Sequence, residues 1–275
     1  MMTEPSLELQ MDAAQAYEAV FIPALFGRWA PQLAQQARLQ PGDRVLDVAC
    51  GTGMFAREAI ARVTPDGTVT GIDPSPAMLA VAAQRWPTVA WTLGTAEQLP
   101  YPDERFDVVA CAFGLMFFSD RNRGLEQMHR VLAPGGRLVL AVWSQLERSP
   151  GYAMMVAMLE RLAGREAADA LRRPFELGDP EALRALLADA GFGNPTIVER
   201  PGRATFPSIS ALVQAEVRGW LPACGVMLDE LTIDRLQADA ERALAPYRAD
   251  GGTVDFECPA VTISATKSRP PIRAR

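Results

Sequence analysis

The chain has 275 residues, a net charge of −6 and 49% hydrophobic residues, enough for one large domain or one domain with insertions. No apolar run reaches the roughly 18 residues that a membrane span needs, and the N-terminus lacks a signal pattern. We therefore expect a soluble, cytoplasmic protein without a membrane span. The arginines are mixed with acids and Lys267 is the only lysine, which argues against nucleic acid as a partner. This Ala-, Arg- and Pro-rich usage is typical of bacteria with GC-rich genomes.

The cysteines and the single histidine do not form a metal-binding or disulfide pattern. No two of the four cysteines, Cys50, Cys111, Cys224 and Cys258, have a C-x-x-C spacing, and His129 is the only imidazole. We expect neither a metal site nor a disulfide framework. The sequence does not define the oligomeric state.

From the N-terminus to residue 143 the pattern changes from helical to alternating. Residues 11–37 have helical spacing, and Pro23 and Pro31 predict a break into two helices. Apolar strands and amphipathic helices then follow one another, which predicts an α/β fold with a doubly wound, mostly parallel sheet. The predicted strands are 44–49, 68–72, 88–93, 106–112 and 137–143, and the helices are 53–63, 75–85 and 120–133.

After Trp143 this rhythm changes. Residues 145–178 read as a Met-rich helical stretch, 179–190 as a sheet-covering helix, 195–206 and 254–265 as strands, and 208–248 as further helices. We divide the chain into an N-terminal helical cap at 1–40, a cofactor-binding core at 41–144, a helical lid at 145–178, the C-terminal part of the sheet at 179–267 with a helical insertion at 208–248, and a disordered tail at 268–275.

The most informative segment is Val45–Phe55, where an apolar strand leads through Asp47 into a Gly-Thr-Gly turn and a helix. Glycines let a ligand approach the backbone, and a helix N-terminus offers free N–H groups. A second strand ends in Asp73, whose carboxylate suits a ribose diol. The pattern predicts a nucleoside-bearing cofactor.

Two cofactors compete for this pattern. Gly51–Ala56 fits the dinucleotide fingerprint G-x-G-x-x-G/A, and Asp73 follows at the spacing expected for NAD. Asp47 favours the other cofactor, because a carboxylate at the turn repels a pyrophosphate and attracts the ammonium and sulfonium groups of S-adenosyl-L-methionine (SAM). Asp47 could also fix the loop by accepting backbone N–H bonds, and both roles can hold together.

Five motifs in order resemble those of the class I SAM-dependent methyltransferases. Asp47-Val-Ala-Cys-Gly-Thr-Gly resembles the first, with Ala49 where the family often has Gly; the others are Gly71–Met78, Gly94–Pro100, Phe106–Cys111 and Arg130–Leu138. The likeness covers residues 40–143 and is greatest to the ubiquinone/menaquinone-biosynthesis branch. It implies a seven-stranded, Rossmann-like sheet, with segments after 194 and 253 pairing at one edge.

The resemblance implies a set of cofactor-binding residues. Asp73 would bind the ribose or cap the next helix, Met78 would cover the adenine or fill the core, and Thr95 replaces an acid that faces the adenine in relatives. The full set is Asp47, Ala49, Gly51, Thr52, Gly53, Asp73, Pro74, Met78, Gly94, Thr95, Ala96, Cys111 and Ala112.

Substrate residues are expected beside the fourth strand and in the helical segments. Phe113 and Phe117 could form an apolar wall, although Phe117 could equally pack on the following helix. Tyr17 and Arg28 could reach the methionine carboxylate or the substrate. In the Met-rich stretch, Met154 and Met158 could adapt to an irregular apolar shape. We identify no catalytic residue, because His129 lies far along a helix and reads as structural.

These observations predict a SAM-dependent methyltransferase acting on O, N or C of a small apolar or aromatic molecule, either quinone-like or secondary-metabolite-like. The alternatives are an NAD-dependent oxidoreductase and a non-catalytic protein that keeps the SAM pocket.

Overall fold

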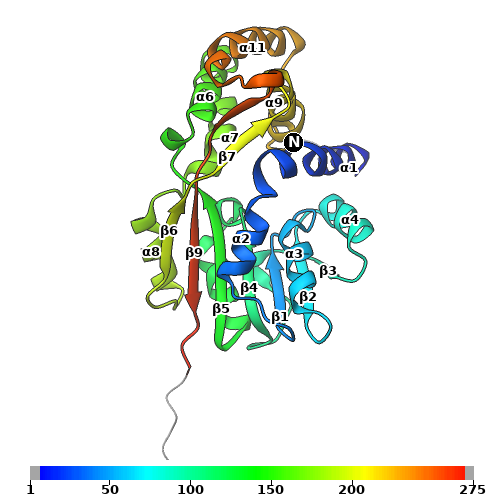
Figure 1. The fold of residues 1–275 in the computed structure, drawn as a ribbon, viewed down its shortest axis with the longest axis vertical. Helices are drawn as coiled ribbons and strands as arrows, with labels where there is room; N and C mark the ends of the chain where they lie inside the picture. Colours follow the sequence, from blue (N-terminus) through cyan, green and yellow to red (C-terminus); the bar gives the residue numbers. More distant parts are fainter. Residues whose placement is uncertain (1–6, 270–275) are drawn as a thin grey trace, which may run out of the picture. The chain divides into compact units, whose positions relative to one another are not determined.

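The structure is a computed structural model that describes residues 7–269 of the chain. The chain divides into two compact units (Figure 1). Unit 1 contains the N-terminal segment up to Gly27, Trp143–Gly178 and Arg200–Ala260; unit 2 contains Arg28–Val142, Asp179–Glu199 and the chain from Val261 onward. The end of the predicted tail, residues 270–275, and residues 1–6 lie outside the described part.

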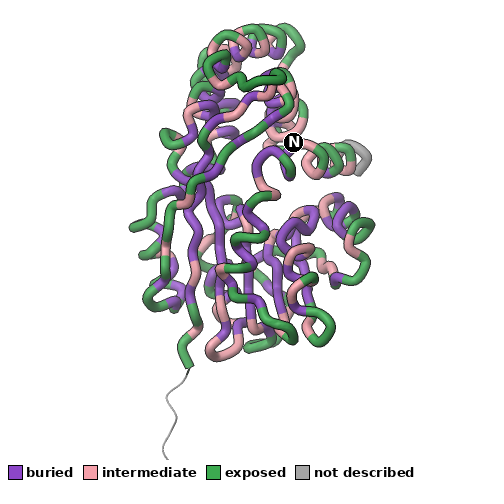
Figure 2. The backbone as a smooth tube through the Cα atoms, in the orientation of Figure 1, coloured by how far each residue is buried: buried purple, intermediate pink, exposed green. Residues whose placement is uncertain are grey.

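Unit 2 is built on a seven-stranded sheet, in the order β3-β2-β1-β4-β5-β9-β6. The pairs β1–β2, β1–β4, β2–β3 and β4–β5 are parallel, which confirms the predicted doubly wound, mostly parallel architecture. Apolar side chains make the central strands continuous buried runs, as Figure 2 shows. The strands are β1 (Arg44–Val48), β2 (Thr68–Asp73), β3 (Ala90–Leu93), β4 (Phe106–Ala112), β5 (Leu132–Trp143), β6 (Thr196–Arg200) and β9 (Ala260–Thr266).

The helices of unit 2 begin at side-chain caps that the sequence supplies. The Ser75 hydroxyl accepts from the N–H of Met78 at 3.3 Å, and the Asp120 carboxylate accepts from that of Arg123 at 2.9 Å. Proline at the first helical position fixes the starting backbone of α4 and α8. The elements are α2 (Trp29–Gln36), α3 (Met54–Val63), α4 (Pro76–Arg85), α5 (Arg121–Val131), α8 (Pro180–Asp189) and the 3₁₀ turns η2 (Ala96–Gln98) and η3 (Leu115–Phe117).

Unit 1 combines helices with a small antiparallel sheet of β7 and β8, in which Ala204 lies opposite Phe256. Its longer elements are α1 (Leu7–Ala16), the π-helix η1 (Tyr17–Phe26), α6 (Pro150–Ala163), α7 (Arg165–Arg172), β7 (Arg203–Phe206), α9 (Ile209–Ala215), the π-helix η6 (Glu216–Trp220), α11 (Glu230–Ala243) and β8 (Val254–Glu257). The short ones are η4 (Leu146–Arg148), η5 (Arg173–Phe175), α10 (Leu221–Ala223), η7 (Ala245–Tyr247) and η8 (Asp250–Gly252).

Two predicted strands are wrong in the same way, because each is two strands in different sheets. The predicted strand 195–206 divides at Pro201 and Gly202 into β6 and β7, and the predicted strand 254–265 divides at Pro259 into β8 and β9. Proline cannot donate to a strand ladder, so pairing stops at each of these positions. One part of each predicted strand joins the large sheet, where β9 lies beside β6 at the edge, as expected. The other parts, β7 and β8, pair with each other in the small sheet.

The predicted break into two helices lies between Pro23 and Pro31, at Gly27. Pro23 lies inside η1, whose wider π turns accommodate a residue that has no N–H to donate. The chain turns instead at Gly27, whose N–H bonds the carbonyl of Ile22 at 2.6 Å. Pro31 falls in the first turn of α2, where a backbone N–H has no intrahelical partner, so a residue without an N–H is tolerated there.

A buried polar pair links two segments of unit 1. The Tyr152 hydroxyl on α6 donates to the Glu216 carboxyl on η6 at 3.0 Å, and both side chains are buried. Burial raises the pKa of Glu216 to about 8, so this carboxyl is largely neutral at pH 7. The pair therefore joins α6 to η6 without an ionised group in the core.

Candidate active site

Most of the predicted cofactor residues lie together at the carboxyl ends of β1, β2, β3 and β4. The strand order reverses between β1 and β4, since β2 and β3 lie on one side of β1 and β4 and β5 on the other. Ligands of open α/β sheets bind in the crevice at such a switch point. Parallel pairing sets the register here, because Asp47 lies opposite Gly71 of β2 and Ala110 of β4. The fold therefore brings the motif residues to one edge of unit 2.

Asp47 is buried, with 1% of its surface exposed, and caps a helix from a neighbouring strand. Its Oδ2 accepts from the backbone N–H of Ala56 in the first turn of α3 at 3.0 Å. Its Oδ1 is buried and has no hydrogen-bond partner within the described residues. Burial raises the pKa of Asp47 to about 8, with the Ala56 N–H opposing that shift. The loop-fixing role that the sequence allowed for Asp47 is thus present, and one acceptor atom remains for a ligand.

Asp73 ties the glycine turn to the end of β2. Its Oδ2 accepts from the N–H of Gly51 at 2.8 Å, and its Oδ1 accepts from the N–H of Ser75 at 2.9 Å. Ser75, and not Asp73, is the residue that caps α4. Each carboxylate oxygen keeps a lone pair after these bonds, so Asp73 can still accept from two vicinal hydroxyls. Burial raises the pKa of Asp73, while these two N–H donors oppose that shift.

The turn between Asp47 and α3 needs backbone conformations that favour glycine. Gly51 and Gly53 have φ of +53° and +85°, and Ala49 also has φ of +53°. A Cβ on Gly51 would meet no heavy atom within 4 Å, whereas one on Gly53 would lie 2.7 Å from the Trp91 ring. Gly51 therefore borders open space, where a ligand can lie against the backbone.

The predicted adenine-side residues follow β2 and β3. Pro74 and Thr95 are exposed, Met78 and Gly94 are half-buried, and Ala96 is buried. The Gly94 N–H donates to the backbone carbonyl of Asp73 at 3.1 Å, which fixes this loop beside the residue predicted to bind the ribose. The half-buried state of Met78 is compatible with both of its predicted roles.

The end of β4 carries three predicted residues. Cys111 is buried and Ala112 is half-buried. Burial raises the pKa of the Cys111 thiol, which stays protonated and serves as a small apolar wall. Phe113 has φ of +61°, rare for a bulky residue, and its N–H bonds the carbonyl of Ala141 at 2.8 Å. Its ring contacts Trp29 of α2 at a centroid distance of 5.9 Å.

Sequence reasoning missed both Trp29 and the strained backbone of Phe113. Trp29 is fully buried and lies 84 residues from Phe113 in the chain, so local spacing gives no signal for their contact. The carboxylate of Glu97 accepts from the N–H of Ser119 at 2.8 Å, which holds the loop that follows η3.

The remaining predicted residues are spread over both units. Phe117 is 45% exposed, and Arg28 is exposed just before α2. Tyr17, Met154 and Met158 belong to unit 1, where the Tyr17 ring contacts Phe26 at 5.4 Å. Their roles toward a substrate stay predictions. Thr52 is buried in the glycine turn.

His129 lies on the last turns of α5, away from the carboxyl ends of the strands. Its ring meets the edge of Phe192 at 4.9 Å, and burial lowers its pKa. This placement agrees with a structural role.

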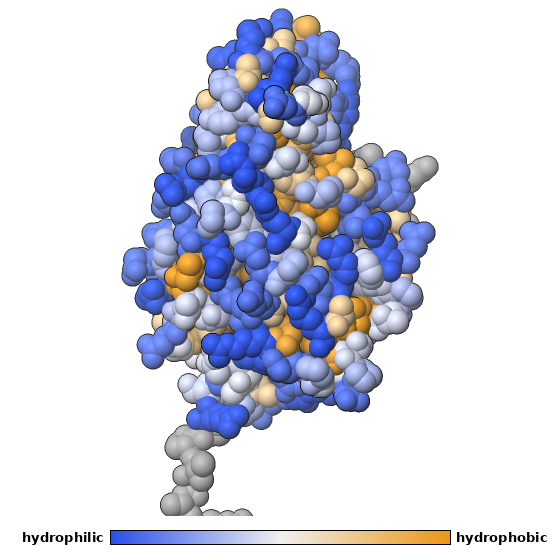
Figure 3. All heavy atoms as spheres, in the orientation of Figure 1, coloured by the Kyte–Doolittle hydropathy of each residue, from blue (hydrophilic) through white to orange (hydrophobic). Residues whose placement is uncertain are grey.

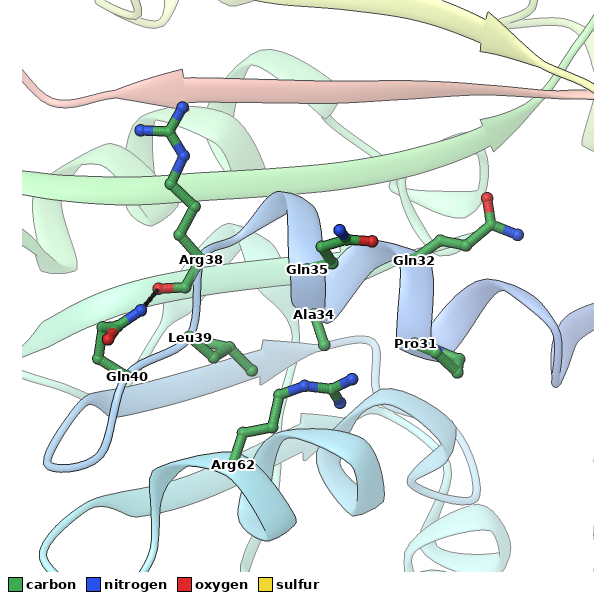
Figure 4. Close-up of a pocket in the computed structure, with 8 residues that line it drawn as sticks. All are labelled: Pro31, Gln32, Ala34, Gln35, Arg38, Leu39, Gln40 and Arg62. Carbon is green, nitrogen blue, oxygen red and sulfur yellow. Dashed lines mark hydrogen bonds between the residues drawn. The ribbon is translucent and has the colours of Figure 1, made fainter.

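A separate pocket of about 460 Å³ in unit 2 lies beside α2 and the last turn of α3. Figure 4 shows the guanidinium groups of Arg38 and Arg62 pointing in different directions, and Arg62 pairs with Glu58 on its own helix. The lining of this pocket contains no predicted cofactor or substrate residue, so we do not assign the pocket to the active site.

The arrangement fits SAM better than a dinucleotide. In dinucleotide-binding folds the N-terminus of the first helix binds the pyrophosphate. Here the side chain of Asp47 already occupies the N–H of Ala56 in that turn, so this donor is not available to a phosphate. The buried, unpartnered Oδ1 of Asp47 suits a cationic donor, Asp73 suits a ribose, and the open face of Gly51 admits the ligand.

Comparison with known proteins agrees with this geometry. A family model described as a methyltransferase domain matches residues 45–136. The chain is 35% identical over 188 residues to the ubiquinone/menaquinone biosynthesis C-methyltransferase UbiE of Ectopseudomonas mendocina, covering 61% of this chain and 72% of that protein. It is 46% identical over 116 residues to the demethylmenaquinone methyltransferase of Deinococcus radiodurans, covering 41% of this chain and about half (48%) of that one.

A solved structure shares the fold. Phosphoethanolamine N-methyltransferase 2 of Haemonchus contortus, in complex with S-adenosyl-L-methionine, has a TM-score of 0.59 and 20% identity, and the match covers 94% of this chain and 57% of that one.

The chain belongs to the class I SAM-dependent methyltransferases, near the branch of the ubiquinone/menaquinone-biosynthesis enzymes. It is a methyltransferase, and its cofactor is S-adenosyl-L-methionine. The NAD alternative allowed by the Gly51–Ala56 spacing is therefore wrong.

Binding at Asp47 is expected to depend on pH. With a pKa of about 8, the Asp47 carboxyl is mostly protonated at pH 7 in the free protein. An ammonium group bound beside it favours the ionised form, so binding releases a proton. We expect the affinity for S-adenosylhomocysteine to rise by up to about tenfold per pH unit from about pH 6 to pH 8, and then to level off.

Calorimetric titrations in buffers of different ionisation enthalpy measure both the affinity and the released proton. Asp47→Asn should bind more weakly and lose the slope. An affinity of the native protein that does not change between these pH values would contradict the assignment.

Proposed function

We propose that this methyltransferase methylates a ring carbon of a small aromatic, quinone-like molecule. The observation that carries the proposal is the pair of buried acids, Asp47 and Asp73, at the ends of adjacent strands in a chain whose relatives are named as quinone-biosynthesis methyltransferases. Carbon is favoured over O and N because the Ectopseudomonas relative is a C-methyltransferase.

Several residues would hold the cofactor. Asp73 would accept the ribose hydroxyls, the backbone at Gly51 would lie against the ligand, and Asp47 would balance the positive charge. When bound, SAM would supply an electrophilic methyl group: a C–C bond to the ring carbon would form as the methyl–sulfur bond breaks, S-adenosylhomocysteine would leave, and the ring carbon's proton would pass to water. The neutral Cys111 thiol does not compete as a nucleophile.

Substrate selection would come from apolar side chains. Phe113 and Phe117 follow β4 in unit 2, and we propose that they form an apolar wall for the substrate. We propose the cytoplasm as the site of the reaction. No described helix is long and apolar enough to cross a membrane.

A transfer assay with a carbon-13 methyl label on SAM tests the proposal. The native protein is incubated with reduced naphthoquinones, phenols and aromatic amines, and the products are examined by NMR. We expect a labelled methyl bound to a ring carbon of a reduced naphthoquinone, together with S-adenosylhomocysteine. A label found only on oxygen or nitrogen would contradict carbon methylation. Cofactor binding without turnover on any of these compounds would contradict a small aromatic or quinone-like acceptor.

A further inference from the structure

Unit 1 contains an apolar cavity whose lining includes none of the residues assigned above to the cofactor or the substrate. It has a volume of about 610 Å³ and is lined by η1, the end of β7, α9 and η6, all parts of unit 1. Figure 3 shows hydrophobic residues gathered on this face, over the region of η1. Cavities of roughly 300–1,000 Å³ with mostly apolar walls are the usual sites of small ligands.

Small side chains explain why the space stays open. Ala211, Ala215 and Gly219 follow one another at intervals of four residues along α9 and η6, so they share one face. A Cβ on Gly219 would lie 3.4 Å from the ring of Phe21. The rings of Phe21 and Phe206 meet edge to face at a centroid distance of 6.3 Å and form a rigid apolar wall.

Both π-helical segments of the described chain border this cavity. Residues of η1 and of η6 line it, and α9 contacts η1 directly. π-Helical turns are rare and occur frequently at functional sites. Their presence on two walls of one cavity is a second observation, independent of its apolar lining.

The polar groups of the lining define the charge of the ligand. Arg218 is neutralised by Glu230, whose two carboxylate oxygens accept from its guanidinium at 2.9 and 2.6 Å. The Nε–H of Arg218 donates to the carbonyl oxygen of the Gln214 side chain at 3.3 Å. The Gln214 amide keeps its NH₂ group as a donor, and its oxygen keeps one lone pair. The lining therefore includes an amide side chain, and its charged side chain, Arg218, is paired with Glu230.

We propose that this cavity binds a neutral, mostly hydrocarbon ligand that carries one hydrogen-bond acceptor, such as a ketone or ester carbonyl. The hydrocarbon part would lie along the face of Ala211, Ala215 and Gly219 and against the rings of Phe21 and Phe206. Its oxygen would accept a hydrogen bond from the NH₂ group of Gln214. None of the residues that line this cavity belongs to the set assigned to the cofactor.

Binding of three probes of equal chain length to the full protein tests this site. We expect saturable binding of 2-decanone, with one ligand per chain, and at least tenfold weaker binding of decanoate and decylammonium, measured by calorimetry. Ala215→Leu fills the cavity from α9 and should weaken 2-decanone binding at least tenfold. Ala238→Leu, at an exposed position of α11, is the matched control and should bind as the native protein does.

Affinity for S-adenosylhomocysteine should be unchanged in both variants, which shows that they are folded. If Ala215→Leu fails to fold, Ala19→Leu fills the cavity from η1, where Ala19 is exposed. Absence of saturable 2-decanone binding would overturn the proposal. Equal binding by a cavity-filled variant, or decanoate binding as tightly as the ketone, would overturn it too.

Discussion

Replacing Asp73 by alanine is expected to reduce the affinity for SAM and S-adenosylhomocysteine by at least about a hundredfold. The carboxylate would make two charge-assisted hydrogen bonds to the ribose, and each is worth roughly 1.5 kcal/mol or more. The same carboxylate accepts from the N–H groups of Gly51 and Ser75, so its loss also loosens the glycine turn. Isothermal titration of the purified variant measures the effect.

Asp66→Ala is the matched control for this variant. Asp66 is an exposed acid in the turn between α3 and β2 of unit 2, so its loss should leave the affinity unchanged. Leaving the two N–H groups without the Asp73 acceptor should also lower the free energy of unfolding by about 2 kcal/mol, which chemical denaturation can detect. Native-like affinity in Asp73→Ala would refute the role of Asp73.

The same substitution at two glycines should separate ligand exclusion from backbone strain. Gly51 and Gly42 both have positive φ, +53° and +88°, and a Cβ on either would meet no heavy atom within 4 Å. Alanine should therefore strain both backbones, at a cost of about 1 kcal/mol in unfolding free energy. Only Gly51→Ala places its methyl group where the cofactor would lie, and we expect its affinity for S-adenosylhomocysteine to fall more than tenfold.

Gly42→Ala should keep the native affinity, because Gly42 lies in the turn that precedes β1. Thermal unfolding compares the strain in the two variants, and calorimetry compares their binding. Equal affinities in both variants would show that the open space at Gly51 is not part of the cofactor site.

The sheet and its ligand-binding edge were predictable because their signals are local. An apolar strand that ends in Asp47, a glycine turn and a helix lie within a dozen residues, and Asp73 ends the next strand. Parallel connectivity then brings the ends of both strands to one edge. The carboxyl edge of the sheet followed from this connectivity without any knowledge of distant contacts.

The features that the sequence did not reveal depend on contacts between distant segments. Tyr152 and Glu216 are 64 residues apart, so neither residue predicts their hydrogen bond. The raised pKa of Asp47, about 8, was not predictable from the sequence either, because it results from burial.

Prolines, which can end a helix or a strand, were harder to interpret than the binding motifs. Pro201 and Pro259 each mark a point where a strand leaves one sheet for another, and a run of strand-forming residues on both sides hides that change of partner. Pro23 had the opposite effect, because a π-helix accommodates it. A proline thus indicates a missing donor, while the surrounding packing decides whether the element ends.

The binding of a SAM-type cofactor at Asp47 and Asp73 is tested most directly by calorimetric titration of the native protein with S-adenosylhomocysteine and, separately, with NADH. Saturable binding of the first, one molecule per chain, and none of the second is the predicted result. Saturable binding of NADH, or no heat with S-adenosylhomocysteine, would contradict a site built for a cationic nucleoside around Asp47 and Asp73.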